Sequence, residues 1–256
     1  MTTKNCFSAQ NCTCLMAEPS PEEQVRSEFN RWAEAGRGED MAEEHAAIAA
    51  GMLAEMAFAP DDKILDAGCG AGWLCGILAE KVPQGQVIGM DVADEMVRRA
   101  RGRFADNPRM MFLIAGVEDI PWDENFFNLA VSIESAYYWP DPAQGFREIF
   151  RVLQPGGSLR ILINLYAENV YSHQWRDLLE VQTHLLSGDE WCQLFRQAGF
   201  TNTRHSRIVD PRPVPDGHVS RWFRSIEEQR ACRREGALLV FGEKPEAPGY
   251  FVRSRN

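Results

Sequence analysis

The sequence predicts an α/β fold with a doubly wound, mainly parallel sheet of seven strands. From residue 60 to about residue 165, short apolar segments typical of buried strands alternate with segments of helical periodicity, joined by short links. The first of these strands runs into Asp66 and a turn with glycine at three alternate positions, and a helical pattern follows. The expected architecture is therefore a wound sheet with a ligand-binding turn after its first strand.

Two helices are expected before the first strand. Ser20-Pro21-Glu22-Glu23 is a good helix start, because proline fits the first helical position and acids suit the first turn. Gly36-Arg37-Gly38 interrupts the helical pattern, and a second helix is expected from about Met41 to Met56.

The remaining elements follow from apolar periodicity and turn residues. Strands are expected at 63–67, 86–90, 111–115, 127–133, 158–164, 201–208 and 237–242, and helices at 72–81, 94–103, 142–153 and 188–198. Gln154-Pro155-Gly156-Gly157 is expected to stop a helix and turn the chain. Two further helices are expected at 168–186 and 218–234, and the segment 209–217, with three prolines and a glycine, reads as a loop.

Charge and cysteine usage limit the class of protein. The net charge of -10, from 27 Lys and Arg against 37 Asp and Glu, argues against nucleic acid as a partner, because an acidic surface repels phosphate backbones. No apolar run is long enough for a membrane span. Seven irregularly spaced cysteines indicate free thiols in a reducing, cytoplasmic compartment. Cys6, Cys12 and Cys14 lack a second pair at zinc-finger spacing, so no metal site is expected.

The glycine turn and the end of the next strand together indicate a nucleotide site. Asp91 lies 23 positions after Gly68, close to the spacing of a carboxylate that binds ribose hydroxyls. Its two acceptor oxygens can take both hydroxyl protons of a vicinal diol. A solvated acid at a strand end is the alternative, but the spacing and context favour ribose.

Two classes of cofactor compete for this site. The dinucleotide fingerprint Gly-x-Gly-x-x-Gly requires a third glycine where this chain has Trp73. Asp66, just before the turn, would repel a pyrophosphate but suits a cationic ligand. An adenosine that carries a sulfonium and an ammonium therefore fits better than NAD, and S-adenosylmethionine is such a molecule.

Four motifs in order resemble class I S-adenosylmethionine-dependent methyltransferases over about residues 60–165. Leu65-Asp66-x-Gly68-Cys69-Gly70-x-Gly72 resembles the first motif of that family, and Val87-Ile88-Gly89-Met90-Asp91 the second. Glu118-Asp119-Ile120-Pro121-Trp122 with Phe126-Phe127-Asn128 is similar to its third-strand segment, and Arg151-Val152-Leu153-Gln154-Pro155-Gly156-Gly157 to the run into its fifth strand. The ubiquinone/menaquinone-type and related small-molecule methyltransferases look closest.

The resemblance implies an architecture and a division of the chain. The last strand would run antiparallel, with an N-terminal helical cover and a helical insert around 165–186. Residues 1–20, which lack periodicity and an apolar segment, are expected to be a disordered leader before a single domain at 21–256. Within this domain we expect a helical cover at 21–59, a cofactor-binding core at 60–165, and a substrate-side insert with the C-terminal strands at 166–256.

The resemblance also implies cofactor contacts at matching positions. These are Asp66 beside the amino group, Gly68 and Gly70 along the methionine and ribose, Asp91 and Val92 at the ribose, Gly116, Val117 and Glu118 around the adenine, and Ile133 facing cofactor and substrate. Many relatives have aspartate where this chain has Gly116, and that acid accepts from the adenine amino group. Here Glu118, a backbone carbonyl or water would have to replace it.

Candidates for the substrate side follow the fourth strand. Glu134 would act as a base or would contact the cofactor or the backbone, and Tyr137 begins an aromatic cluster with Tyr138 and Trp139 that would cover the substrate or simply pack. His173, in the expected insert, is a weaker catalytic candidate. Another aromatic pair in the first helix, Phe29 and Trp32, would fold over the ligand of the glycine turn.

The expected function is transfer of the S-adenosylmethionine methyl group to a small-molecule acceptor by in-line displacement. A non-catalytic S-adenosylmethionine-binding protein of the same fold is the first alternative. An NAD-type oxidoreductase is the second.

Overall fold

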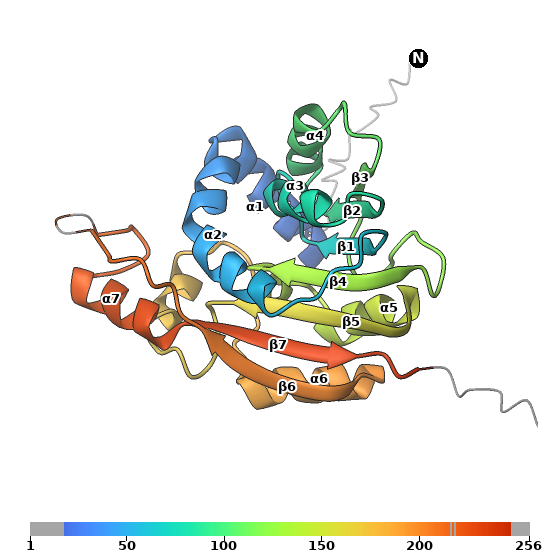
Figure 1. Ribbon diagram of the computed structural model, residues 1–256. Helices are drawn as coiled ribbons and strands as arrows, with labels where there is room; N and C mark the ends of the chain where they lie inside the picture. Colours follow the sequence, from blue (N-terminus) through green and yellow to red (C-terminus); the bar gives the residue numbers. More distant parts are fainter. Residues whose placement is uncertain (1–17, 216, 218, 247–256) are drawn as a thin grey trace, which may run out of the picture.

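The described residues form one mixed sheet with helices on both faces. The computed structural model describes residues 18–215, 217 and 219–246, so the predicted leader and its three cysteines lie almost wholly outside this part. The strands are β1 (Lys63–Ala67), β2 (Gln86–Asp91), β3 (Met110–Ile114), β4 (Phe127–Ile133), β5 (Leu153–Ile163), β6 (Thr201–Ile208) and β7 (Ala237–Glu243), in the spatial order β3-β2-β1-β4-β5-β7-β6 (Figure 1).

The prediction of a mainly parallel, seven-stranded sheet agrees with this topology. Strands β1 to β5 pair in parallel, whereas β7 runs antiparallel to both β5 and β6. In Figure 1 the arrow of β4 points left and that of β7 points right. The carboxyl ends of the parallel strands therefore meet at one edge, where wound sheets bind ligands.

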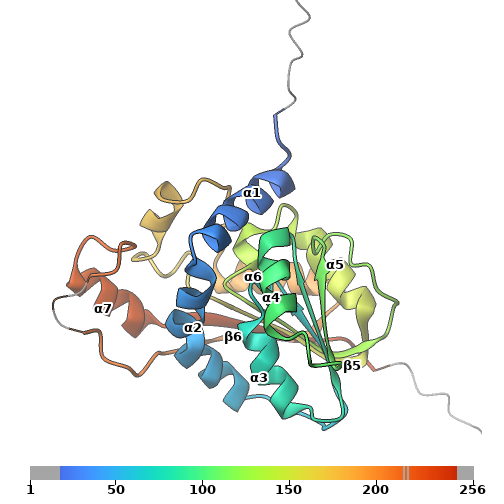
Figure 2. The same ribbon diagram turned by 90° about the horizontal axis from the view of Figure 1, so that it is seen from above.

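Helices cover the two faces of the sheet in separate groups. Above the strands in Figure 1 lie α2 (Arg37–Ala54), α3 (Trp73–Lys81) and α4 (Asp94–Arg103); α6 (Gly188–Ala198) lies below, and Figure 2 shows it behind the strands. Met52, Leu74 and Leu78 are fully buried in the core on the α2–α3 side. Phe146, from α5 (Pro142–Val152), packs with Trp191 and Phe195 of α6 in the other core.

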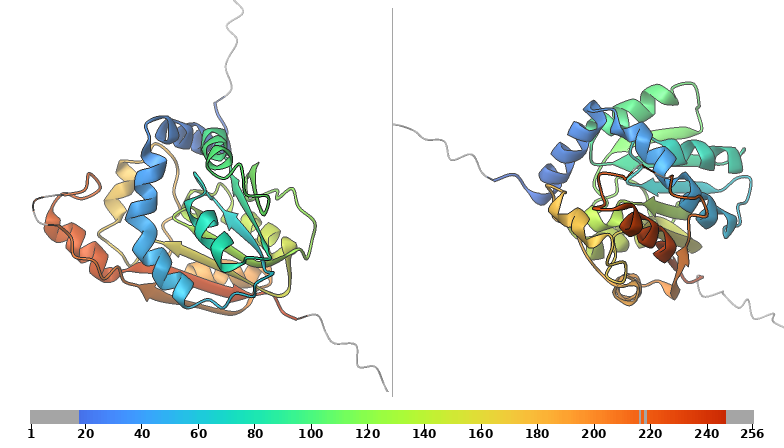
Figure 3. Two further views of the ribbon diagram at one scale, coloured as in Figure 1. Left: turned by 45° about the horizontal axis from the view of Figure 1, so that its top comes forward. Right: turned by 90° about the vertical axis from the view of Figure 1, so that its left-hand side faces the viewer.

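The N-terminal helices are held at the carboxyl edge of the sheet. Helix α1 (Pro21–Glu34) begins with a reciprocal capping box between Ser20 and Glu23, and α2 follows after Gly36, whose φ is +79°. Asn30 of α1 accepts from the Glu95 amide and donates to Asp94, which joins α1 to the start of α4. Figure 3 shows α1, the segment after β5 and α7 (Ile226–Glu235) gathered at this edge.

The predicted helical insert is wrong. Between β5 and α6 the chain forms turns and one short 3-10 helix, η2 (His173–Asp177). Buried Asn169 donates to the Asn164 carbonyl and Ser172 donates to the Asn169 carbonyl. Such side-chain bonds satisfy the backbone locally and compete with a continuous helix.

Two predicted helix boundaries also differ from those in the structure. Helix α5 ends at Val152 and passes directly into β5, so Pro155, Gly156 and Gly157 lie within an irregular part of the strand rather than in a turn. Helix α7 (Ile226–Glu235) begins later than predicted, because Ser225 caps it by accepting from the Glu228 amide.

No helix in the described part of the chain combines the length and apolar character that a membrane crossing requires.

Lys244 closes the end of α5 where no glycine cap is present. Its ammonium donates to the carbonyls of Phe150 and Leu153, at 2.8 and 2.7 Å, and to Asn125 Oδ1 at 2.9 Å. A cation at a helix C-terminus satisfies carbonyls that have no partner within the helix and interacts favourably with the helix dipole.

We predict that Lys244→Met lowers the free energy of unfolding by about 1–3 kcal/mol, because partly buried carbonyls lose a charged donor. Urea denaturation followed by circular dichroism measures this. Lys81→Met is the matched control, since Lys81 is exposed and its ammonium lies 5.5 Å from the Phe58 ring centroid. Equal stability of Lys244→Met and wild type would show that Lys244 does not support the helix end.

Candidate functional site

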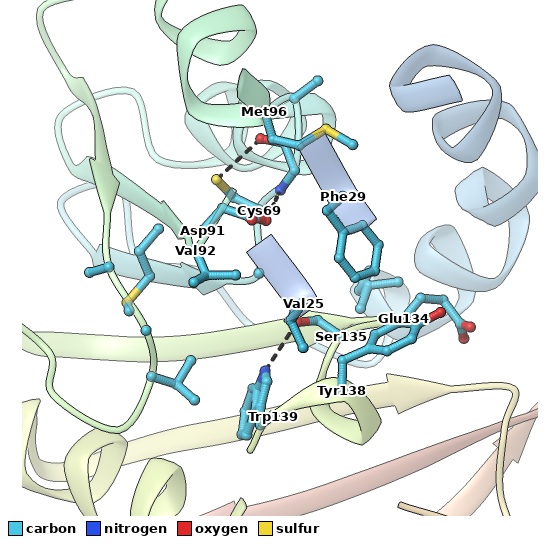
Figure 4. A pocket seen from close by; sticks show the side chains of 18 of the residues that line it. Val25, Phe29, Cys69, Asp91, Val92, Met96, Glu134, Ser135, Tyr138 and Trp139 are labelled. Atoms are coloured by element: carbon cyan, nitrogen blue, oxygen red, sulfur yellow. Dashed lines mark hydrogen bonds between the residues drawn. The ribbon is translucent and has the colours of Figure 1, made fainter. Parts of the chain in front are cut away.

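A cavity lies at the carboxyl edge of the sheet, beneath α1 (Figure 4). Its wall includes nine of the predicted site residues, namely Gly68, Gly70, Asp91, Val92, Gly116, Val117, Glu118, Ile133 and Glu134. The chain segments that sequence analysis treated separately therefore border one space.

The glycine turn after β1 is shaped by backbone conformations that favour glycine. Gly68 has φ of +81°, and a Cβ there would lie 1.9 Å from Ser135 Oγ, so a side chain is excluded. Gly70 has φ of +51°, and a Cβ there would meet nothing within 4 Å. Gly70 thus leaves open space in the cavity wall, where a ligand can approach the backbone.

Asp91 is fixed to this turn. The Gly70 amide donates to Asp91 Oδ2 at 2.8 Å, and the Ala93 amide donates to Oδ1 at 2.9 Å. Burial raises the pKa of the Asp91 carboxyl, and these amide hydrogen bonds act in the opposite direction. Each oxygen keeps acceptor capacity for a hydroxyl group, so the geometry suits a vicinal diol.

The charges around the cavity select the kind of cofactor that fits. Glu22, Asp91, Glu118 and Glu134 border it, and its described wall includes no Lys or Arg. Four acids in a wall without Lys or Arg disfavour a pyrophosphate and favour a sulfonium and an ammonium, and Arg26 offsets one of these charges by binding Glu22 from outside the wall. The residues present therefore fit S-adenosylmethionine and do not fit a dinucleotide.

Asp66 does not reach the cavity wall. Its side chain is 2% exposed and accepts from the Cys75 thiol at 3.1 Å, beneath the turn. Burial raises the pKa of the Asp66 carboxyl to about 7. The structure thus places Asp66 under the glycine turn. Asp66 does not line the cavity, where the predicted contact with the cofactor amino group would require it.

The other end of the cavity is mainly apolar and aromatic. Phe29 of α1 packs against Tyr138 there, with ring centroids 4.9 Å apart in an edge-to-face arrangement (Figure 4). Met41 and His45 of α2 also line the cavity. Burial and the charge of Arg212 lower the pKa of His45 to about 4, so its imidazole is neutral at pH 7.

Glu134 lies at this end in an uncommon backbone conformation. Its φ is +53°, a region that non-glycine residues occupy at some cost and often at functional sites. Oε1 accepts from the Asn164 amide at 2.6 Å and from its side chain at 3.0 Å, and Oε2 accepts from the Tyr137 hydroxyl at 2.9 Å. Burial raises the pKa of the Glu134 carboxyl to about 7.

Three other predicted site residues lie outside the cavity wall. Trp32 packs behind Phe29 and donates its indole N–H to Glu28 at 2.6 Å. Tyr137 is buried and positions Glu134 through its hydroxyl. His173 lies on η2, where Nε2 is 3.0 Å from the Ala167 carbonyl oxygen. None of the three is among the residues that line the cavity.

Several wall residues were not predicted. Glu22 and Val25 share the face of α1 that carries Phe29, at spacings of three and four residues. This helical spacing was a usable signal, because residues so spaced lie on one face. Met41 and His45 of α2 follow the same rule, but nothing in the sequence indicates which helical face meets the cavity.

Comparisons with known proteins show which family the chain resembles. Residues 65–161 match a family model described as a methyltransferase domain. A putative methyltransferase solved in complex with the Haloferax volcanii Trm112 methyltransferase activator is 30% identical, with a TM-score of 0.78 over 86% of this chain and 98% of that one.

Two curated relatives act on quinone-type molecules according to their names. The rice 2-methyl-6-phytyl-1,4-hydroquinone methyltransferase 1 is 26% identical over 72% of this chain and 52% of its own length. The demethylmenaquinone methyltransferase of Lactiplantibacillus plantarum is 26% identical over 61% of this chain and 77% of its own length. For most of the curated relatives, including the rice enzyme, the chain spans about half of the relative's own length or less, between 32% and 52%.

The glycine turn, the fixed Asp91, the acidic cavity and the close structural likeness agree with one another. The chain belongs to the class I S-adenosylmethionine-dependent methyltransferases.

Proposed function

We propose that this protein transfers the methyl group of S-adenosylmethionine to an uncharged, largely apolar small molecule. The observation that carries this is one continuous cavity with a different character at each end. Gly70 and Asp91 border the end suited to the cofactor, and Phe29 and Tyr138 border the other (Figure 4). Two molecules that share one cavity can be held for direct displacement at the methyl carbon.

The cofactor supplies an activated methyl group on a sulfonium leaving group. The protein then has to hold the acceptor in line with the methyl carbon and sulfur and exclude water, which can contribute roughly 7–11 kcal/mol. Acidic groups and a neutral imidazole disfavour a phosphorylated or carboxylate acceptor. A hydroquinone or phenol fits, and the names of two relatives point to the same class.

Glu134 is the proposed base for an acceptor that loses a proton. Three hydrogen-bond donors fix its carboxylate. Its pKa of about 7 suits a base that must accept a proton from the acceptor at neutral pH. Tyr137 and Asn164 act as positioning residues in this proposal. The N-terminal helices and the segment 166–256 would enclose the acceptor, and the core at 60–165 would hold the cofactor.

A protein partner is proposed for the open edge of the sheet. Strand β3 is one of the two edge strands of the sheet, and Met111 and Ile114 are 50% and 46% exposed there. Exposed apolar residues on an unpaired edge are suited to strand addition by another protein. The relative solved with a Trm112 activator makes a Trm112-type protein the proposed occupant.

Calorimetry is expected to show that the protein binds S-adenosylmethionine and S-adenosylhomocysteine and does not bind NAD. We predict that Asp91→Ala weakens S-adenosylhomocysteine binding at least about tenfold, because a carboxylate hydrogen bond contributes about 1.5–3 kcal/mol. Asp106→Ala, which removes an exposed acid after α4 and outside the cavity wall, is the control. Unchanged affinity in Asp91→Ala would show that Asp91 is only a strand-end acid.

Glu134→Gln is predicted to lower kcat about 10²–10⁴-fold while the affinity for S-adenosylhomocysteine changes little. In the wild type, kcat/KM for a hydroquinone acceptor should rise as pH increases through about 7, because Glu134 becomes ionised there. The variant should lose this rise. A variant with an unchanged pH profile would exclude Glu134 as the base.

The partner proposal predicts that a Trm112-type protein from the same organism copurifies with the wild-type chain. The double variant Met111→Glu, Ile114→Glu should lose this association, because two buried charges would oppose the contact. Val170→Glu, also at an exposed apolar residue but away from β3, should retain it. Equal copurification of the β3 double variant would exclude this edge as the binding surface.

A further inference from the structure

Two carboxylates converge on Gly116 at the end of the cavity next to β3. A Cβ on Gly116 would lie 3.1 Å from Glu118 Oε2 and 3.3 Å from Glu22 Oε2. Glu118 follows β3 in the chain, whereas Glu22 comes from the first turn of α1. Acids from two distant parts of the sequence therefore meet at one point on the cavity wall.

Hydrogen bonds fix the orientation of both carboxylates. The Asp141 amide donates to Glu118 Oε1 at 3.1 Å, and the Arg26 guanidinium donates to Glu22 Oε1 at 2.7 Å. Arg26 also donates to the Val92 carbonyl at 3.1 Å, so the end of β2 helps to place Glu22. With each Oε1 held in this way, Oε2 of each residue is its atom nearest the Cβ position of residue 116.

The order of the strands indicates which part of the cofactor reaches these acids. The turn after β1 is followed across the sheet by Asp91 on β2 and then by Gly116 beyond β3, while Glu134 lies on the opposite side, after β4. A cofactor with its ribose at Asp91 and its methyl group toward Glu134 must extend its base toward Gly116. Val92 and Val117 supply apolar walls there for a flat ring.

We propose that Glu22 and Glu118 together accept the two N–H groups of the adenine 6-amino group. An amino group with two diverging hydrogens matches two acceptors that approach from different elements. The pair would replace the aspartate that the family resemblance implies at position 116. This inference rests on the proposed function, and it makes α1 part of the cofactor site.

The arrangement explains why glycine is suitable at position 116. A third carboxylate there would add repulsion to two acids already within 3.3 Å of the Cβ position. Burial, together with the charges of Glu22 and Asp141, raises the pKa of the Glu118 carboxyl. A donor with two hydrogens placed between the acids relieves this unfavourable charge and gains two hydrogen bonds.

The test compares S-adenosylhomocysteine with S-inosyl-L-homocysteine, in which an oxygen replaces the 6-amino group. Calorimetry on the wild type should show a preference of at least about 100-fold for the adenine compound, because the inosine oxygen would face two carboxylates. Glu22→Gln and Glu118→Gln should each weaken S-adenosylhomocysteine binding about tenfold and reduce this preference by a similar factor.

Glu34→Gln is the matched control, since it removes one exposed acid from the same helix, outside the cavity wall. Thermal melting checks that each variant is folded. Gly116→Asp should weaken S-adenosylhomocysteine binding, and stronger binding would overturn the proposal. An unchanged preference in Glu22→Gln would also overturn it, whereas a wild type that binds neither compound would instead reject the proposed function.

Discussion

The hydrogen bond from the Gly70 amide to Asp91 Oδ2 joins the two chain segments on which the cofactor site depends. It forms because Gly68 and Gly70 adopt positive φ angles that turn the chain sharply after β1. Parallel pairing of β1 with β2 then brings Asp91 beside that turn. The sheet thus supplies a rigid edge, and the turn and the acid are fixed to it before any ligand binds.

Electrostatics gives this edge its selectivity. The described cavity wall combines four acids with no Lys or Arg, so its field favours a cationic cofactor and disfavours an anionic acceptor. The raised pKa of Glu134 and the lowered pKa of His45 have burial as their largest cause. Enclosure by α1 and α2 therefore shapes both the cavity and the proton affinities of the groups that face the acceptor.

Local patterns in the sequence predicted the sheet, the glycine turn and Asp91, because strand periodicity and residue spacing determine these features directly. Glu22 and His45 were missed because their positions depend on how α1 and α2 pack, and contacts such as Asn30 with Asp94 leave no periodic signal. The segment around His173 has helix-forming composition, but buried Asn169 and Ser172 bond to the backbone instead. The conformation of this segment therefore depends on tertiary contacts rather than on local sequence.

The most direct test of the account is a crystal structure of the protein with S-adenosylhomocysteine. The account predicts ribose hydroxyls at Asp91, the adenine edge at Gly116 and the sulfur directed toward Glu134 and Tyr138. The space beyond the sulfur should be apolar, enclosed by α1 and α2, and large enough for an aromatic acceptor. A cofactor bound in the reverse direction, or outside this cavity, would contradict the account.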